Sequence, residues 1–130
     1  MVVLIDSHTP ADYVVIEASE IIYRHEADQV RQAVVTHVQQ HGELRLLVCL
    51  DANLVGLDPD ADWTYDTFED EWLQRQVKQI AIVGDPKWQD HALMFFLSGI
   101  VPAPIKFFPT EQESLARAWL GDQRYLVSNP

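Results

Sequence analysis

The sequence is poor in cysteine, in long apolar runs and in basic charge. Its one cysteine, Cys49, excludes an internal disulfide and a zinc site built from several thiolates. No apolar run approaches the roughly 18 residues of a membrane-spanning helix. No basic residue precedes the apolar stretch Val2–Ile5, so the N-terminus lacks the pattern of a secretory signal peptide. Together these absences predict a cytoplasmic protein in which Cys49 is a buried strand thiol.

Basic charge is scarce as well. The chain has 9 Lys and Arg against 20 Asp and Glu, a net charge of −11. Basic side chains supply most of the affinity for nucleic acid and for anionic lipid. The composition therefore excludes nucleic acid and a basic membrane patch. It leaves open the insertion of an apolar element into a membrane, and it is compatible with a basic protein partner.

The length and the hydrophobic pattern predict one domain over residues 1–130. Hydrophobic residues make up 48% of the 130-residue chain, enough for a single core. Alternating or continuous apolar runs predict strands at Val2–Asp6, Tyr13–Ala18, Leu44–Leu50, Ile80–Val83 and Ile105–Phe108. Helical spacing predicts four helices, over about 26–41, 59–77 and 86–98 and from Thr110 onward, with a capping box between Thr110 and Glu113. Residues 124–127 form a last expected extended segment.

The order of these elements defines the fold class. Strands that alternate with helices are typical of an α/β fold with a mostly parallel sheet. The first two strands lie close enough for a hairpin, which adds an antiparallel strand at the N-terminal edge. We expect four or five strands and about four helices.

Four segments carry a resemblance to a known family. They are Leu44–Val48, Ile80–Trp88 with its Val-Gly-Asp-x-x-Trp stretch, Ile105–Phe108, and Ala116–Leu120 with its Ala-x-x-Trp-Leu stretch. In combination they make the chain similar, over nearly its whole length, to the SpoIIAA-like family of STAS domains. The resemblance implies a sheet of four or five strands backed by helices. It also implies a binding role, since ligand or membrane association is proposed for the mostly uncharacterised members.

The resemblance stops short of one regulatory feature. In the anti-sigma-factor antagonists of the wider STAS group, a phosphorylatable serine opens the helix after the central strand. The corresponding stretch here, Asp51–Gly56, contains no Ser or Thr. We therefore expect no phosphoserine switch at this place.

Two patterns suggest metal ligands, and neither is complete. An acidic stretch matches the ligand spacing of a calcium loop with Asp58, Asp60, Asp62, Thr64, Asp66 and Glu69. Trp63 stands where that loop needs glycine, and an N-cap at Asp58 followed by Pro59 explains the stretch more simply. The second pattern is His37 and His41, which are four residues apart on the first predicted helix and could share a face. A metal would need further ligands, and histidines also suit a helix C-terminus. We predict no metal and no cofactor.

The loop after the fourth strand is a candidate anion site. Gly84, Asp85 and Lys87 lie where a parallel strand runs into a helix, the place where α/β folds bind ligands. N-capping by Asp85 is the simpler interpretation. The alternative is a small anion held by Lys87 and backbone amides, as in an unrecognised small-molecule enzyme.

The third predicted helix carries two apolar stripes. A helix outside a sheet needs one, so the second must be covered by the chain itself, a second subunit, a membrane or a ligand. An apolar groove between the second and third helices would be lined by Trp63, Trp72, Trp88, Leu93, Met94 and Leu97.

These observations lead to one favoured function and two alternatives. The sequence shows no nucleophile elbow and no thiol paired with a base, so we predict that the protein is not an enzyme. We expect a STAS-like binding or regulatory module that engages an apolar small ligand, a membrane or a protein partner through the groove. The alternatives are a homodimeric structural or regulatory domain without a small ligand, and the enzyme at the Gly84–Lys87 loop.

Overall fold

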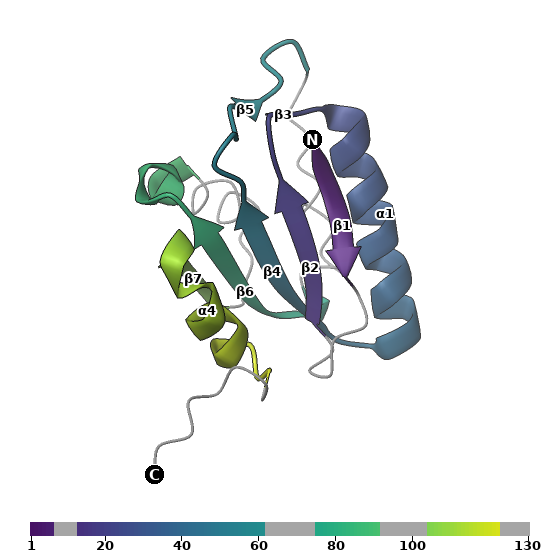
Figure 1. The fold of residues 1–130 in the computed structure, drawn as a ribbon. Coiled ribbons are helices and arrows are strands. Elements are labelled where there is room, and N and C mark those ends of the chain that lie inside the picture. The colour runs from purple at the N-terminus through teal and green to yellow at the C-terminus, as the bar shows by residue number, and fades with distance from the viewer. Residues whose placement is uncertain (7–12, 62–74, 92–103, 123–130) are drawn as a thin grey trace.

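Five strands form one mixed sheet in the order β1-β2-β4-β6-β7 (Figure 1). The strands are β1 (Val2–Asp6), β2 (Tyr13–Ala18), β4 (Leu44–Leu50), β6 (Val77–Gly84) and β7 (Ile105–Pro109). The computed structural model describes residues 1–6, 13–61, 75–91 and 104–122 of the chain. β1 pairs antiparallel with β2, and all the other neighbours are parallel, so the predicted α/β fold with its antiparallel N-terminal edge is confirmed.

The predicted strand positions are confirmed, with small changes at their ends. β1, β2 and β4 have the predicted bounds, whereas β6 starts at Val77 rather than Ile80. Its first residue pairs with Leu44 across a register shift that lets both strands start together. The second predicted helix therefore ends before Val77. Most of that helix, most of the third and residues 124–127 lie outside the described residues.

A second, two-stranded sheet was not predicted. β3 (Ile21–Ile22) pairs parallel with β5 (Gly56–Leu57) beside the carboxyl end of the main sheet. Strands of two residues are too short to show an alternating pattern, so sequence periodicity could not predict them. Gly56 has a φ of 143°, a conformation that only glycine adopts without strain.

The first helix, α1 (Arg24–His41), ends as predicted and starts two residues earlier. The backbone amide of Tyr23 donates to Glu26 Oε1 at 3.3 Å, an N-terminal bond that fixes the earlier start. Gly42 follows with a φ of 83°, and its amide donates to the Val38 carbonyl at 2.7 Å. The helix therefore stops at the glycine that the sequence indicated.

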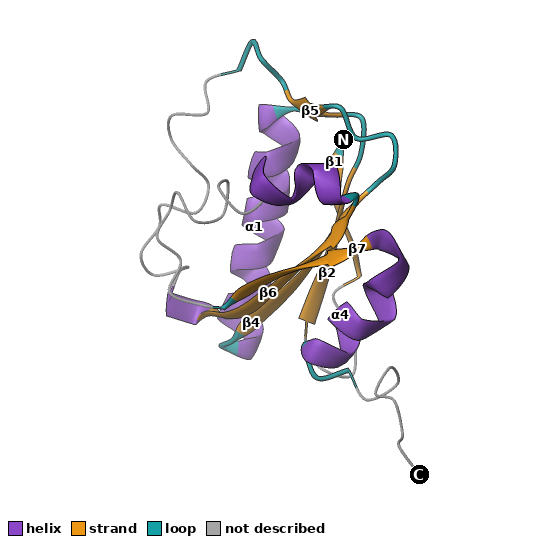
Figure 2. Ribbon diagram, turned by 90° about the vertical axis from the view of Figure 1, so that its left-hand side faces the viewer, coloured by secondary structure: helices purple, strands orange, loops and turns teal. Residues whose placement is uncertain are grey.

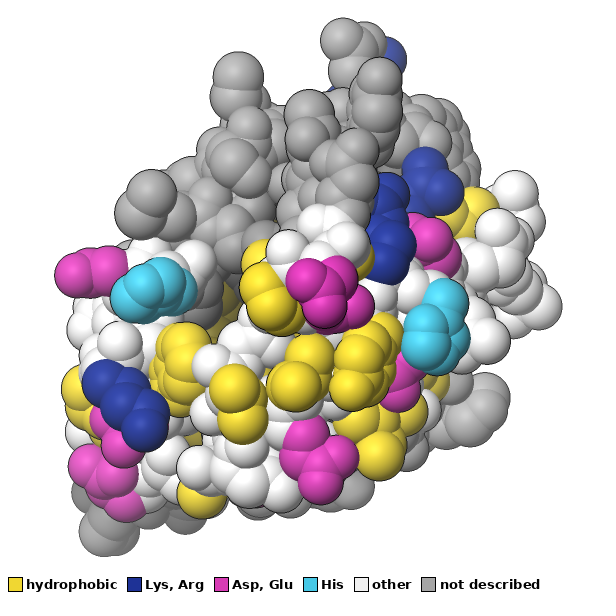
Figure 3. Space-filling view, turned by 90° about the horizontal axis from the view of Figure 1, so that it is seen from above, with side chains coloured by type: hydrophobic (Ala, Val, Ile, Leu, Met, Phe, Trp, Pro, Cys, Tyr) yellow, Lys and Arg dark blue, Asp and Glu magenta, His cyan; other side chains and the backbone are white. Residues whose placement is uncertain are grey.

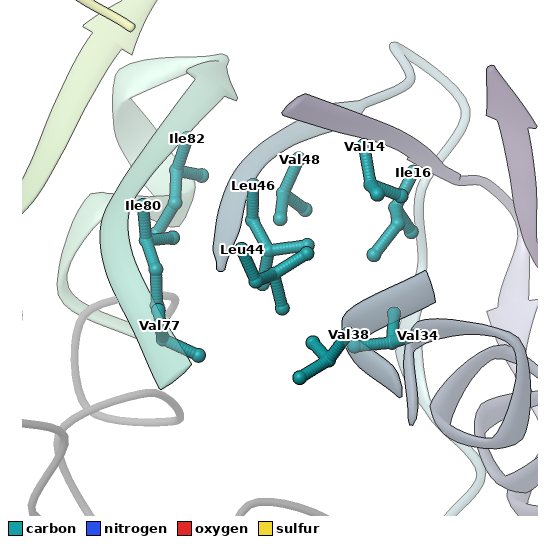
Figure 4. Close-up of a cluster of buried hydrophobic side chains, with 10 residues drawn as sticks. All are labelled: Val14, Ile16, Val34, Val38, Leu44, Leu46, Val48, Val77, Ile80 and Ile82. Atoms are coloured by element: carbon teal, nitrogen blue, oxygen red, sulfur yellow. The ribbon is translucent and has the colours of Figure 1, made fainter. Parts of the chain in front are cut away.

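The sheet separates two cores, with α1 on one side and α4 (Glu113–Trp119) on the other (Figure 2). Alternate residues of each strand point to opposite faces. The α1 side buries Val14, Ile16, Val34, Val38, Leu44, Leu46, Val48, Val77, Ile80 and Ile82 (Figure 4). The α4 side buries Tyr13, Val15, Leu47, Ala81, Val83, Phe108, Ala116 and Leu120.

The last helix differs from its prediction at the start. Thr110–Gln112 forms a 3₁₀ turn, and α4 follows at Glu113. Neither segment has a side-chain cap, so the predicted capping box between Thr110 and Glu113 is wrong. Glu113 instead pairs with Arg117 one turn later, at 3.3 Å.

The sheet itself caps the other end of α4. Arg45 Nη1 donates to the carbonyl of Leu120 at 3.3 Å, and Gln79 Nε2 donates to that of Trp119 at 3.2 Å. Arg45 and Gln79 are paired neighbours on β4 and β6. A cation and an amide thus satisfy carbonyls at the negative end of the helix.

Candidate functional site

The carboxyl ends of β2, β4 and β6 lie at one end of the molecule (Figure 1). β3, β5, the N-terminus and the start of α1 lie at the same end. Open α/β sheets bind ligands outside the carboxyl ends of their strands, so this end is the candidate site.

Four exposed apolar side chains belong to this end, and we call them the apolar band. The exposed fractions are 44% for Met1, 43% for Tyr23, 66% for Val55 and 40% for Leu57. Seen from above, hydrophobic side chains form a strip across the surface with acidic side chains on both sides (Figure 3). Exposed apolar side chains that gather in one place are typical of an interaction surface.

Backbone hydrogen bonds hold the elements that carry the apolar band. The Val55 amide donates to the Glu20 carbonyl at 2.7 Å, and the Asp58 amide donates to the Ile22 carbonyl at 2.9 Å. The amino group of Met1 donates to the carbonyls of Ser19 and Ile21. The surface is therefore assembled from three chain segments before any partner arrives.

One residue of this end has an unusual backbone. Glu20 has a φ of 53°, and among the described residues it is the one non-glycine with a positive φ. Its carbonyl accepts from the amides of Val55 and Gly56 at 2.7 and 3.4 Å. Residues in such conformations cluster at functional sites, because the surrounding structure must compensate for their strain.

Acidic side chains flank the apolar band. Glu20, Asp51 and Asp60 are exposed, and Asp58 is half-buried. Asp51 Oδ1 accepts from the Asn53 amide at 3.1 Å, and Asp58 Oδ1 accepts from the Asp60 amide at 3.0 Å. These two carboxylates therefore shape the loops on either side of β5 and also give the site a negative rim.

The predicted metal patterns show no ligand set within the described residues. No group of three or more His, Cys, Asp or Glu side chains there can hold a metal ion. Most of the calcium-loop residues, from Asp62 to Glu69, lie outside the described part of the chain. The ring centres of His37 and His41 lie 4.5 Å apart with the rings tilted by 37°, and His37 is buried whereas His41 is exposed.

The predicted anion loop has little donor capacity. Asp85 Oδ1 accepts from the Lys87 amide at 2.9 Å, and the Asp85 carbonyl accepts from the Trp88 amide at 2.9 Å. Pro86 has no N–H, and the next amide, Gln89, donates to the Pro86 carbonyl. The predicted N-cap is confirmed. The backbone amides of Lys87, Trp88 and Gln89 thus all donate within the loop, which leaves them no part in holding an anion.

Gly84 has a packing role in the same loop. A Cβ at this position would lie 2.8 Å from Leu50 Cβ, closer than such atoms approach. The glycine therefore allows β6 to end beside Leu50, which explains it without an anion.

One residue of the predicted groove lies in the described part of the chain. Trp88 is half-buried, with its ring edge-on to His91 at 6.0 Å and Lys87 Nζ at 5.7 Å from its centre. The other five predicted groove residues, Trp63, Trp72, Leu93, Met94 and Leu97, lie outside the described residues. The groove therefore stays a prediction.

A buried polar cluster under α4 was missed by sequence reasoning. The Tyr13 hydroxyl donates to Asp122 Oδ2 at 2.6 Å and accepts from Arg117 Nη1 at 2.9 Å. Tyr13 and Asp122 are both 0% exposed. Burial, together with the hydrogen bond to Asp122, raises the pKa of Tyr13. The three residues come from opposite ends of the chain, and no local pattern could have joined them.

Cys49 lies on β4 near the start of α4, and it is half-buried rather than fully buried as predicted. Its thiol donates to Glu113 Oε1 at 3.8 Å. Burial, and to a smaller extent the Glu113 charge, raises the pKa of Cys49 to about 12. The thiolate is the nucleophilic form, so this cysteine is close to inert at neutral pH.

Comparisons with known proteins agree with this architecture. A family model described as SpoIIAA-like matches residues 13–121. An uncharacterised protein from Shewanella loihica with a SpoIIAA-like fold superposes with a TM-score of 0.65 and 22% sequence identity, over 92% of this chain and 93% of that one. The search of curated proteins found no match. Within the described part of the chain, no helix has the length and hydropathy needed to cross a bilayer.

Proposed function

Because the chain belongs to the SpoIIAA-like family, we propose that it is a non-catalytic binding and regulatory module. It engages a protein partner through the apolar band at the carboxyl end of its sheet. The observation that carries the proposal is the exposure of Met1, Tyr23, Val55 and Leu57, between 40% and 66% each, at this end of the fold.

The chemistry of the described residues supports binding over catalysis. The pKa values of Tyr13 and Cys49 are both shifted upward, away from the ionised and reactive forms of these side chains. Both side chains pack in the α4 core. A nucleophilic or basic role for either side chain at neutral pH would need a pKa shifted in the other direction.

Surface shape and charge favour a macromolecule as the occupant. Small-molecule sites are concave and bury most of their ligand, whereas the band consists of side chains that are already open to solvent. The net charge of −11 disfavours an anionic membrane and also a second copy of the same chain. An apolar ligand, a membrane and a homodimer are the alternatives that the experiment must separate.

Native mass spectrometry of protein purified gently from its host tests the proposal. We expect a protein partner that the wild type and Leu115→Lys retain and that Val55→Lys loses. Leu115 is the matched control, because it is also a large exposed hydrophobic residue but lies on α4, away from the apolar band. Its side chain is 47% exposed, and that of Val55 is 66% exposed. A retained apolar small molecule or a bare homodimer would replace the proposal with one of the alternatives. If Val55→Lys and Leu115→Lys retain the partner equally, the apolar band is not the surface that binds it.

A further inference from the structure

β5 is an edge strand of the two-stranded sheet. Among the residues that the structure describes, β5 pairs with β3 alone, in the register Ile21↔Gly56 and Ile22↔Leu57. In this parallel register the bonds to Ile22 come from Gly56 and Asp58, the latter through its amide at 2.9 Å. Bonding groups alternate in direction along a strand, so the N–H and C=O of Leu57 point away from β3.

The usual devices that protect an open edge are sparse here. Edge strands are commonly guarded by lysine, by proline or by short length. The stretch from Asp51 to Ala61 contains no Lys or Arg, and its proline, Pro59, comes two residues after Leu57. Short length is the protection that remains, since β5 has 2 residues.

The surroundings of this edge define the chemistry that would fit it. Val55 and Leu57, at 66% and 40% exposure, offer apolar contacts beside the open backbone groups. Asp51 and Asp60 are exposed on either side of β5, and Glu20 is exposed beside β3. A strand that pairs with Leu57 would thus meet apolar side chains on β5 and carboxylates in the neighbouring loops.

We propose that β5 accepts an extended, basic and apolar segment of another protein as an added strand. This inference rests on the proposed function, because it names the partner of the same surface. Backbone hydrogen bonds to Leu57 fix the segment, apolar side chains cover Val55 and Leu57, and Lys or Arg side chains pair with the acidic rim. Because β5 is short, the side-chain contacts supply most of the affinity, and binding is weak and dependent on salt.

The test is a titration of ¹⁵N-labelled full-length protein with synthetic peptides of about ten residues, long enough to span a strand and its flanks. The probe alternates lysine and valine. One control peptide carries N-methyl groups on alternate residues, which remove backbone donors and keep the side chains. A second control replaces every lysine with glutamate.

We expect the lysine–valine peptide to shift the amide signals of Leu57 and Asp58. N-methylation should weaken binding about tenfold, the loss expected for one or two backbone hydrogen bonds. The glutamate peptide should not bind. Val55→Lys should weaken binding of the lysine–valine peptide, and Leu115→Lys should leave that binding unchanged.

The contradicting results separate this inference from the proposed function. Equal binding of the N-methylated peptide would overturn strand addition and leave the apolar band as a binding surface. Equal binding of the glutamate peptide, or no binding of any peptide, would also overturn the inference. In those cases the mass-spectrometric comparison of Val55→Lys with Leu115→Lys still decides the proposed function.

Discussion

The buried cluster of Tyr13, Arg117 and Asp122 gives the account its sharpest energetic test. Tyr13→Phe removes one oxygen atom and keeps the ring in the α4 core. That oxygen donates to Asp122 at 2.6 Å and accepts from Arg117 at 2.9 Å. The substitution therefore takes one hydrogen bond from a buried carboxylate and another from a guanidinium.

The magnitude follows from the kind of bond that is lost. A hydrogen bond to a charged group contributes about 1.5–3 kcal/mol. Of the two partners, Asp122 is 0% exposed and the Arg117 side chain is 15% exposed. We expect the free energy of unfolding to fall by about 2–3 kcal/mol. With an m-value of about 1.5 kcal/mol/M in urea, the unfolding midpoint falls by about 1.3–2 M.

The assay is urea unfolding followed by tryptophan fluorescence and circular dichroism. Tyr23→Phe is the matched control, because Tyr23 is 43% exposed and its hydroxyl can exchange for water. That control should change stability by less than about 0.5 kcal/mol. If Tyr13→Phe costs no more than Tyr23→Phe, the cluster does not hold α4 to the sheet and the reasoning fails.

The same residue predicts a response to alkaline pH. The pKa of Tyr13 is raised in the folded protein, so unfolded chains lose this proton first as the pH rises past 10.0. The stabilisation is complete below that pH and is lost as the pH climbs towards the folded value. The wild type should therefore lose stability above pH 10.0 more steeply than Tyr13→Phe, measured in a shared Cys49→Ala background.

Three further predictions test local features. Gly84→Ala should destabilise the protein by about 1–3 kcal/mol in the same urea assay, because the new Cβ would lie 2.8 Å from Leu50 Cβ; an unchanged midpoint would mean that the two strands separate freely. Cys49 should react with a thiol reagent at pH 8 roughly a thousandfold more slowly than a thiol of pKa 9.0, because its own pKa is about 12. A reaction rate near that of free cysteine would contradict the burial of the thiol. Glu20→Gly should leave the free energy of unfolding unchanged or raise it by up to about 1 kcal/mol, because glycine adopts a φ of 53° without strain. A large loss of stability would show that the Glu20 side chain supports the fold.

The main sheet could be predicted because each of its strands has a strong periodic signal. Tyr13–Ala18 and Leu44–Leu50 are nearly continuous apolar runs, and they form two adjoining interior strands of the sheet. Gly42 marked the end of α1, because a helix stop at a glycine depends on local backbone freedom alone. Strands and helix ends that depend on neighbouring residues alone could therefore be predicted from the sequence.

The candidate site was harder to predict, because its determinants are not local. The apolar band consists of Met1, Tyr23, Val55 and Leu57, which no periodicity connects. The pairing of β3 with β5 brings the segments of Tyr23, Val55 and Leu57 to one end of the fold. The Tyr13–Asp122 bond joins residues 109 positions apart. The sequence instead directed attention to the aromatic residues of the second and third predicted helices, and of these Trp88 lies within the described residues.

Site-specific photo-crosslinking in living host cells tests the central claim most directly. A photoreactive amino acid replaces Val55 in one variant and Leu115 in the other, two exposed positions on different parts of the fold. The account predicts one discrete crosslinked protein from position 55 and none from position 115. That partner, once purified, should bind the wild type about tenfold more tightly than Val55→Lys. Crosslinks to lipid or to a second copy of the chain, or equal yields from both positions, would contradict the assignment of the apolar band as a partner-binding surface.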